Sequence, residues 1–448
     1  MKQRFCRLLA GLLASVFLLA GCGSAPPEPD PVPIIPPAPG ETVRLDVATD
    51  LHLITPALVQ DGESFRAAYE SGDGKQINYI SQITDAFLAQ VIAEKPNALI
   101  LTGDLSLDGE KKSHEDLAAR LERVRRAGIP VFVIPGNHDI NNSYAAGFKK
   151  NKKYNTPGID PQEFAQIYQN CGYGDAVSRD ETTLSYLAQI SPDLWLVMLD
   201  TNIYDVKAGM SLSPVGGSLS AETLSWLERC LQDAEEAGAT VISATHHNLV
   251  DHSDRINKNY TLDNAQEVLD LYDRYGVVVN LSGHIHVQSI AASQRENHGI
   301  FDIATSSLAV YTNQYGQLTV EPGKRISYHT QEVDVEGWAT QTGSEDENLL
   351  HFEDYSYRFF YDLSFARSLY NLYMDQVPAD DAQVMAQTMA LLNPVYFSGT
   401  VGEIREEILA SDHYALWKKK GAMVSYEYNE SMLKVPDYDP RRVEIPLS

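Results

Sequence analysis

The sequence is poor in basic residues, and the apolar run near its start is too short to cross a membrane. Lysine and arginine total 35 against 61 for aspartate and glutamate, so the formal net charge is -26. A chain of this charge has no basic surface to neutralise a nucleic-acid backbone, which excludes nucleic-acid polymers as partners. If the protein acts on an anionic substrate, the positive charge must come from another source, and a bound metal ion is the usual one.

Cysteine is also scarce, with four residues in the whole chain. Cys6 and Cys22 fall at the start of the chain, so only Cys171 and Cys230 remain for the folded part. One disulfide between them is compatible with an oxidising compartment, whereas a packed thiol is the alternative for Cys230, which falls in a predicted helix. Both alternatives stay open at this point.

The first residues predict export and a lipid anchor. Basic residues precede an apolar run from Leu8 to Ala20, the order of a secretory signal, so residues 1–21 are predicted to be a signal peptide. The run ends in LLAG before Cys22, which resembles a bacterial lipoprotein box and implies lipidation of that cysteine. An ordinary signal peptide is the alternative. We therefore expect a protein anchored by lipid to the cell membrane, on its extracytoplasmic side.

Three further regions follow the predicted signal. Proline dominates residues 22–41, which predicts an extended linker after the lipidated cysteine. Residues 42–335 alternate between strand and helix patterns, and residues 336–448 predict a helical C-terminal domain that ends in an irregular tail. No internal repeat of fixed period stands out.

The alternating region predicts an α/β core with helices covering the outer faces of its sheets. Helical spacing of apolar residues runs from Ile80 until Pro96, and a further helix is predicted to begin at Ser220 and end at Gly238. Helices are also predicted over 114–127, with Ser113 as cap, and before Tyr275. The predicted strands are 43–49, 98–104, 130–136, 194–201, 240–245 and 276–283.

Polar residues stand at the ends of five of these strands. They are Asp50 and His52, Asp104, Asn137 and His138, His246 and His247, and His284 and His286. Ligands of open α/β sheets bind at this edge of the sheet. Carboxylates, imidazoles and an amide oxygen are ligands for divalent metal ions, so the set predicts a metal site, although each residue alone is more often structural.

The ordered series DLH, GD, GNHD, HH and GHIH resembles the motif set of the calcineurin-like metallophosphoesterase superfamily. The resemblance implies a four-layer αββα sandwich and two divalent metal ions, with Mn, Fe and Zn as candidates. It also implies that a hydroxide bridging the two ions attacks phosphorus. Carried over by position, Asp50, His52 and His286 hold one ion, Asn137, His246 and His284 hold the other, and Asp104 bridges them.

The resemblance implies that His138 has a catalytic role and does not bind a metal ion. It would protonate the leaving oxygen or stabilise charge on the phosphoryl group, help that is worth about 10²–10⁴ in rate. Many relatives have a polar residue three positions after the bridging aspartate to support this histidine, but here that position is Leu107. Asp108 or Asp139 could take over, or His138 is unassisted.

Three features next to these motifs have expected roles of their own. His247 either faces the substrate or packs in the core. The loop FKKNKKYN supplies Lys149, Lys150, Lys152 and Lys153, which either steer a phosphate inward or form a solvated loop, the alternative we favour. Gly136 is expected to let the chain turn tightly off its strand.

The sequence pattern of the C-terminal part predicts helices, which we expect to form a cap on the α/β domain. Further helical stretches are predicted over 382–392 and 401–409, without metal-type clusters. Apolar and aromatic residues that recur three and four positions apart predict one amphipathic helix. Its aromatic face is made of Phe352, Tyr355, Phe359, Leu363, Ala366, Tyr370 and Tyr373.

A lipoprotein signal, this motif set and a helical extension together resemble bacterial class III cyclic nucleotide phosphodiesterases. The expected function is therefore hydrolysis of a small phosphate ester, a phosphodiester such as a cyclic nucleotide. The alternatives are a phosphomonoesterase or nucleotidase on the same fold, and a surface binding lipoprotein with a vestigial site. The intact set of seven ligand positions argues against a vestigial site.

Overall fold

The computed structural model describes residues 30–204, 214–420, 424–434 and 438–447 of the 448-residue chain. The predicted signal peptide (1–21) and the lipidation site Cys22 lie outside the described residues. Within the described part, no helix combines the length and the apolar character needed to cross a membrane.

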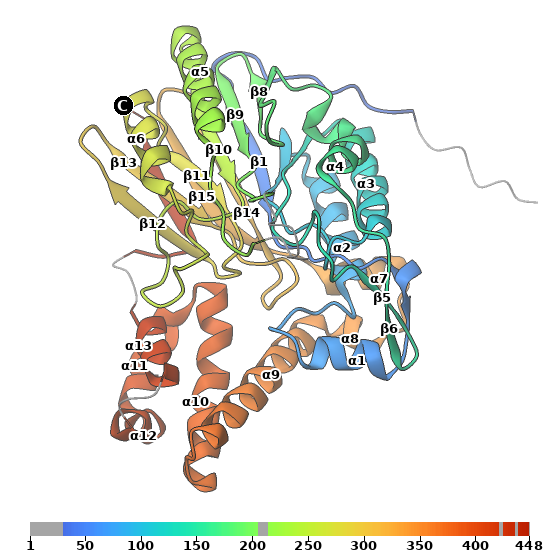
Figure 1. Ribbon diagram of the computed structural model, residues 1–448, viewed down its shortest axis with the longest axis vertical. Helices are drawn as coiled ribbons and strands as arrows, with labels where there is room; N and C mark the ends of the chain where they lie inside the picture. Colours follow the sequence, from blue (N-terminus) through green and yellow to red (C-terminus); the bar gives the residue numbers. More distant parts are fainter. Residues whose placement is uncertain (1–29, 205–213, 421–423, 435–437, 448) are drawn as a thin grey trace, which may run out of the picture.

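Two large sheets form the centre of the molecule (Figure 1). In the first, β1, β3 and β4 are parallel, and β14, β15 and β16 continue it antiparallel from β1. Its strands, in spatial order, are β16 (Arg442–Pro446), β15 (Arg325–Glu332), β14 (Gln314–Glu321), β1 (Val43–Ala48), β3 (Ala98–Leu101) and β4 (Val131–Val133).

The second sheet has a parallel centre of β9, β10, β11 and β13, with antiparallel strands at both edges. Its strands, in spatial order, are β12 (Ser289–Gln294), β13 (Gly299–Ala304), β11 (Val279–Ser282), β10 (Thr240–Thr245), β9 (Leu194–Leu199), β8 (Tyr186–Ser191) and β7 (Ser178–Arg179). The strands predicted from the sequence are present, and several end earlier because their polar residues belong to the following loops.

Helices cover the sheets on opposite sides, which confirms the predicted α/β sandwich. The helices α2 (Ile80–Glu94) and α3 (Lys111–Arg126) lie on one side, and α5 (Ala221–Ala237) and α6 (Ala265–Tyr275) lie on the other (Figure 1). Strand β9 shows the layering: Leu194, Leu196 and Met198 belong to the core shared with the first sheet, whereas Trp195, Val197 and Leu199 pack with α5 and α6. Helix α5 begins after Ser220 and ends at Gly238 as predicted.

The remaining small elements connect the larger ones. They are η1 (Pro56–Leu58), β2 (Val59–Gln60), α1 (Glu63–Glu70), β5 (Ala146–Lys149), β6 (Lys152–Asn155), α4 (Pro161–Ile167) and η2 (Gln169–Tyr173). The lysine-rich loop is in fact the hairpin β5–β6, in which Lys149 pairs with Lys152. All four of its lysines are exposed, in line with the solvated alternative, and a steering role stays a prediction.

Most of the C-terminal helices lie together at the end of the molecule opposite α5, and the first of them lies beside α2 (Figure 1). They are α7 (Val335–Thr342), α8 (Glu347–Leu350), α9 (Phe352–Met374), α10 (Ala379–Ser398), α11 (Val401–Ala410), α12 (Asp412–Lys420) and α13 (Val424–Met432). Helices α9–α13 have an apolar core of their own around Leu372, Met385 and Trp417, whereas Ala339 of α7 and Leu349 of α8 belong to the core of the α/β domain. They also contact the α/β domain, since the Asn78 amide donates to the Tyr355 hydroxyl at 2.7 Å.

The predicted aromatic face of α9 is confirmed at its first residue, Phe352, which is buried, and is wrong towards the end of the helix. Tyr370 and Tyr373 are 64% and 47% exposed, whereas the buried stripe of the helix contains Ser356, Ser364 and Ser368. The Ser356 hydroxyl accepts from the Gln76 amide of the α/β domain at 2.6 Å, and Ser364 and Ser368 line a cavity beside α10. Hydrophobic periodicity does not register small polar residues on a buried face.

Two other expectations need correction, and the open question of the disulfide is decided. The predicted irregular tail contains β16, which pairs with β15, so the chain returns from the helices to the first sheet. Helix α3 begins at Lys111, and Ser113 is buried inside it, where its hydroxyl accepts from the Thr55 N–H at 3.2 Å. Cys171 and Cys230 are both buried free thiols, so they form no disulfide.

Candidate metal centre

The polar strand ends meet at one edge of the two sheets. Two groups of potential ligands lie there, each with ligand atoms within 4.8 Å of one another. One contains Asp50, His52, Asp104 and His286, and the other contains Asp104, His246 and His284. Asp104 belongs to both groups because β3, which it follows, pairs with β1 in the first sheet and its loop faces the second sheet.

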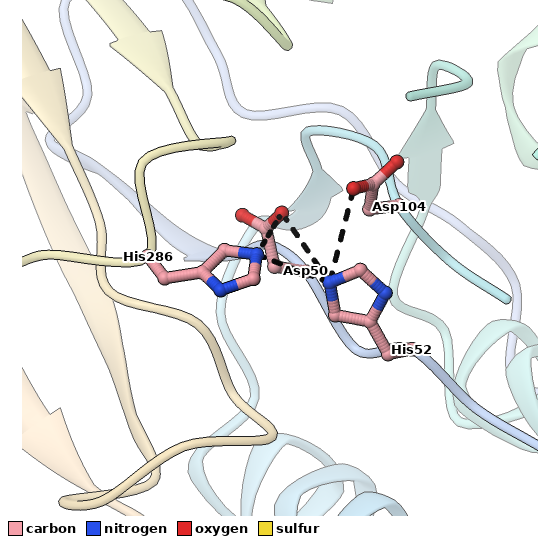
Figure 2. Close-up of side chains that lie close together, drawn as sticks. All are labelled: Asp50, His52, Asp104 and His286. Atoms are coloured by element: carbon pink, nitrogen blue, oxygen red, sulfur yellow. Dashed lines mark hydrogen bonds and ion pairs between the residues drawn. The ribbon is translucent and has the colours of Figure 1, made fainter. Parts of the chain in front are cut away.

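The first group is closely packed and buried (Figure 2). The Nε2 atoms of His52 and His286 lie 3.1 Å apart. Asp50 Oδ1 is 3.2 Å from His286 Nε2, and Asp104 Oδ2 is 3.8 Å from His52 Nε2. Burial strongly lowers the pKa of His52 and, together with the charge of Lys75, outweighs the opposing effect of Asp104. A neutral imidazole, the form that binds metal, is therefore favoured.

The second group joins the two sheets. His246 Nε2 lies 3.4 Å from Asp104 Oδ1 and 3.2 Å from Asn137 Oδ1. The other ring nitrogen, Nδ1, is 2.9 Å from the carbonyl oxygen of Thr102, so it must donate a proton there and Nε2 is left to face the site. His284 uses Nε2 to contact the Asn259 carbonyl at 3.0 Å, which leaves Nδ1 as its free ring atom.

Five of the candidate ligands have left-handed backbone conformations. Asp50, His52, Asp104, His284 and His286 all have φ between 46° and 68°. Such values are uncommon outside glycine and cost about 1–3 kcal/mol each, so they persist only where surrounding contacts enforce them. Here the Asp50 N–H donates to the Gly103 carbonyl at 3.0 Å, and the His52 N–H donates to the Asp104 carbonyl at 2.9 Å. These bonds tie the loops after β1 and β3 together.

Gly136 is required for a reason other than the predicted turn. Its φ is not positive, but a Cβ atom at this position would lie 2.2 Å from Asp104 Oδ1. The absent side chain therefore makes room for the shared carboxylate. The predicted residue is right, and the predicted reason is wrong.

Asp108 is the carboxylate beside His138. His138 Nδ1 is 2.8 Å from the Leu107 carbonyl and 3.3 Å from Asp108 Oδ1, and Nε2 is 4.0 Å from Asp104 Oδ2. Burial lowers the pKa of His138, but the charge of Asp104 and the hydrogen bond to Asp108 outweigh it and raise the pKa to about 9. Asp108 thus takes the position expected of the supporting residue, one step later in the chain.

Asp139 has a structural role instead. Its carboxylate accepts hydrogen bonds from the backbone N–H groups of Leu105, Ser106 and Gly136 at 2.8–3.0 Å, and from the Ser106 hydroxyl at 2.7 Å. It is fully buried. The side chain therefore joins the turn that contains Asn137 and His138 to the loop that contains Asp104.

His247 packs in the core. Its two ring nitrogens contact the Thr201 hydroxyl at 2.7 Å and the Val215 carbonyl at 2.9 Å, and the ring lies 4.5 Å from that of His284. Burial is the main reason that its pKa falls to about 3. Both nitrogens are engaged, so His247 supports the ring of His284 and does not face a substrate.

Comparison with known proteins assigns the α/β domain. The family model described as calcineurin-like phosphoesterase matches residues 43–288, more than half of the chain. The chain belongs to the calcineurin-like phosphoesterase family. The family resemblance stated from the sequence is thereby confirmed, together with the expectation of a phosphoric ester hydrolase of a family that uses divalent metals.

The helical region of this phosphoesterase matches a second family model. Residues 334–439 match the model described as the C-terminal domain of cyclic nucleotide phosphodiesterase. A protein from Nostoc sp. named 3',5'-cyclic-nucleotide phosphodiesterase is 26% identical over 230 residues, which cover 50% of this chain and 69% of that protein. The predicted likeness to cyclic nucleotide phosphodiesterases is therefore confirmed.

Solved structures with similar folds are distant in sequence. A dimetal phosphatase from Danio rerio has a TM-score of 0.44 and 12% identity, covering 65% of this chain and 96% of that one. A purple acid phosphatase from Lupinus luteus has a TM-score of 0.41 and 13% identity, covering 68% and 53%.

The donor atoms of the phosphoesterase fit divalent metal ions. Asp50 Oδ1 is buried and receives no hydrogen bond from any described residue, yet it faces the imidazole nitrogens of His52 and His286. Oxygen and imidazole donors that converge in this way suit Mn, Fe or Zn. The number and identity of the ions, and the assignment of each ligand, stay predictions.

Lys75 acts on the site through its charge, although the sequence analysis did not single it out. Its side chain is only 12% exposed, and its Nζ lies 3.3 Å from Asp73 Oδ2. Its charge lowers the pKa of His52 and opposes the upward shift at His138. The segment SGDGK, a lysine after two glycines between helices, is the signal that would have identified it.

Proposed function

We propose that this protein is a dinuclear-metal-dependent phosphodiesterase whose substrates are cyclic nucleotides or similar small diesters. The observation that carries the proposal is the combination of two ligand groups sharing Asp104 with a C-terminal region that matches that of cyclic nucleotide phosphodiesterases. The name of the Nostoc relative supports the same substrate class.

The seven residues at the sheet edge would hold the metal ions. Asp50, His52 and His286 would bind one, and Asn137, His246 and His284 the other, with Asp104 shared. Two divalent ions would neutralise and polarise the phosphoryl group, which supplies the positive charge that the acidic chain lacks. The left-handed loops would fix the positions of five of these ligands.

His138 would handle the proton of the leaving group. Its Nδ1 proton is directed to the Leu107 carbonyl and to Asp108, so the ring cannot turn freely. Nε2 is then the atom that faces Asp104 and transfers a proton to the leaving oxygen. The lipid anchor predicted at Cys22 would hold this chemistry at the extracytoplasmic face of the membrane.

The choice between diester and monoester substrates is tested directly. We expect the mature protein with Mn²⁺ to hydrolyse bis-p-nitrophenyl phosphate with a higher kcat/KM than p-nitrophenyl phosphate. Assays of 3',5'- and 2',3'-cyclic nucleotides with the same preparation then identify the class of the natural substrate. A clear preference for the monoester refutes the diesterase proposal and favours a phosphomonoesterase or nucleotidase.

A further inference from the structure

A short segment between α1 and α2 connects the candidate metal centre to the C-terminal helices. Gly74, with φ of 99°, packs so closely on Phe360 of α9 that a Cβ atom would lie 2.1 Å from its ring. The Gln76 amide donates to the Ser356 hydroxyl at 2.6 Å, and the Gln76 N–H donates to the Ala309 carbonyl at 2.8 Å. Helix α9 therefore holds the segment that carries Asp73 and Lys75.

A cavity of about 370 Å³ lies between this segment and helices α9, α10 and α13. Its lining includes Asp73, Phe360, Arg367, Ser368, Phe397 and Tyr428. The rings of Phe360 and Phe397 meet edge to face, with centroids 5.0 Å apart. Cavities of about 300–1,000 Å³ with aromatic walls and a few polar groups are typical of small-molecule sites.

Two walls of the cavity are connected to segments that carry candidate site residues. The Phe397 carbonyl accepts from the Gln288 N–H at 2.9 Å, two residues after His286. Phe397 also packs against the apolar cluster of Ile285, Val287 and Ala304, which includes both neighbours of His286 in the chain. On the other wall, Asp73 is paired with Lys75 at 3.3 Å.

We propose that this cavity binds the nucleobase of the substrate, so that the C-terminal helices select nucleotide diesters for the metal centre to cleave. The proposal rests on the phosphodiesterase function above and adds the part of the protein that recognises the nucleoside. A planar neutral base can stack on an aromatic ring wherever a face of the ring is exposed. This stacking is worth about 1–3 kcal/mol per base.

The cavity wall carries charges of both signs. Asp73, which is 48% exposed, is paired with Lys75 at 3.3 Å, and Arg367 lines the cavity as well. Because the charges of Asp73 and Lys75 offset each other, recognition of the base rests on the aromatic rings of the cavity.

A bulky residue in the cavity tests the proposal. Ser368 is 6% exposed and lines the cavity, so Ser368→Trp fills it. Ala366→Trp adds the same side chain to the exposed face of the same helix and is the matched control. For each variant, kcat/KM is measured with Mn²⁺ for 3',5'-cyclic AMP and for methyl p-nitrophenyl phosphate, which has no nucleobase.

The ratio of the two kcat/KM values is the readout, because it does not depend on the fraction of active enzyme. We expect Ser368→Trp to lower the ratio of cyclic AMP to methyl p-nitrophenyl phosphate by at least about fivefold, the lower end of the value of one stacked base, while Ala366→Trp leaves it unchanged. Tyr428→Ala, which removes a ring without overpacking, lowers the ratio too and replaces Ser368→Trp if that variant does not fold.

The outcomes separate the two proposals. An unchanged ratio in the folded cavity variants, or an equal fall in Ala366→Trp, overturns the nucleobase site. Wild-type protein that cleaves methyl p-nitrophenyl phosphate but not cyclic AMP also overturns it, while the diesterase function stands. Wild-type protein that cleaves neither diester refutes the proposed function itself.

Discussion

Two regions of the molecule are built on opposite principles. One is the edge of the sheets that carries the candidate metal ligands, and the other is the group of C-terminal helices. The edge consists of loops in which fully buried polar side chains contact one another and five candidate ligands have positive φ. The helices consist of regular backbone around an apolar core, with serines on the buried stripe of α9. At the sheet edge each polar atom has a specific position, whereas the helices leave a cavity.

This difference suggests a division of labour between the two regions. Polar groups in a buried site cost free energy unless each is paired, so substitution at the sheet edge should abolish the chemistry. Helices that surround a cavity can change their lining side chains without losing the fold, so they are suited to select the substrate. The following predictions test this division, from the largest effect to the smallest.

The largest effect is expected from loss of the shared carboxylate. Asp104→Ala removes a ligand from both groups at once, so metal content measured by plasma mass spectrometry should fall for the whole site and activity should drop to background. A chelator should have the same effect on the wild-type protein, reversed by Mn²⁺. The control is Asp362→Ala on the exposed face of α9, which should keep both metal and activity. Full activity in Asp104→Ala would contradict a shared metal ligand.

A smaller effect is expected at His138, which contacts the site without being a predicted ligand. His138→Ala should retain the metal content of the wild type and lose about 10²–10⁴ in kcat, the usual value of general acid help. Metal analysis of the same sample as the kinetic assay distinguishes the roles. If the variant loses metal together with activity, His138 is a ligand and its assigned role is wrong.

The smallest effect is expected at the contact between the two regions. Ser356 accepts from the Gln76 amide and donates to Asn313 Oδ1 at 2.7 Å, so Ser356→Ala leaves buried polar groups without a partner. The unfolding free energy should fall by about 1–3 kcal/mol, measured by chemical denaturation, while kcat changes little. Ser225→Ala on the exposed face of α5 is the control, with an expected change within about 0.5 kcal/mol. A loss of activity as large as that of His138→Ala would mean that the helices take part in the chemistry.

Much of the α/β domain could be predicted from the sequence because its signals are local. Apolar runs such as the one before Asp104 indicate a strand buried on both faces, and polar residues directly after a strand must lie at the carboxyl edge of a sheet. Ser220 and Gly238 mark the two ends of α5 through capping geometry that depends only on neighbouring residues.

The C-terminal helices were predicted less well because their packing depends on residues far away in the chain. The rings of Tyr370 and Tyr373 suggested a buried face, but the side of α9 that faces its neighbours carries small residues such as Ser364 and Ser368, which line the cavity. Strand β16 pairs with β15, more than a hundred residues earlier. Neither feature is visible in a local pattern.

The sequence by itself determined which residue types stand at the strand ends, and hence the family and the set of candidate ligands. Only the tertiary structure decided how they are used: Asp108 rather than Asp139 contacts His138, His247 packs in the core, Gly136 makes room for Asp104, and the charge of Lys75 acts on the site from a segment held by α9. The physical reason is distance in the chain. A motif records which side chains are present, but hydrogen bonds, close approaches and charges act between atoms that only folding brings together.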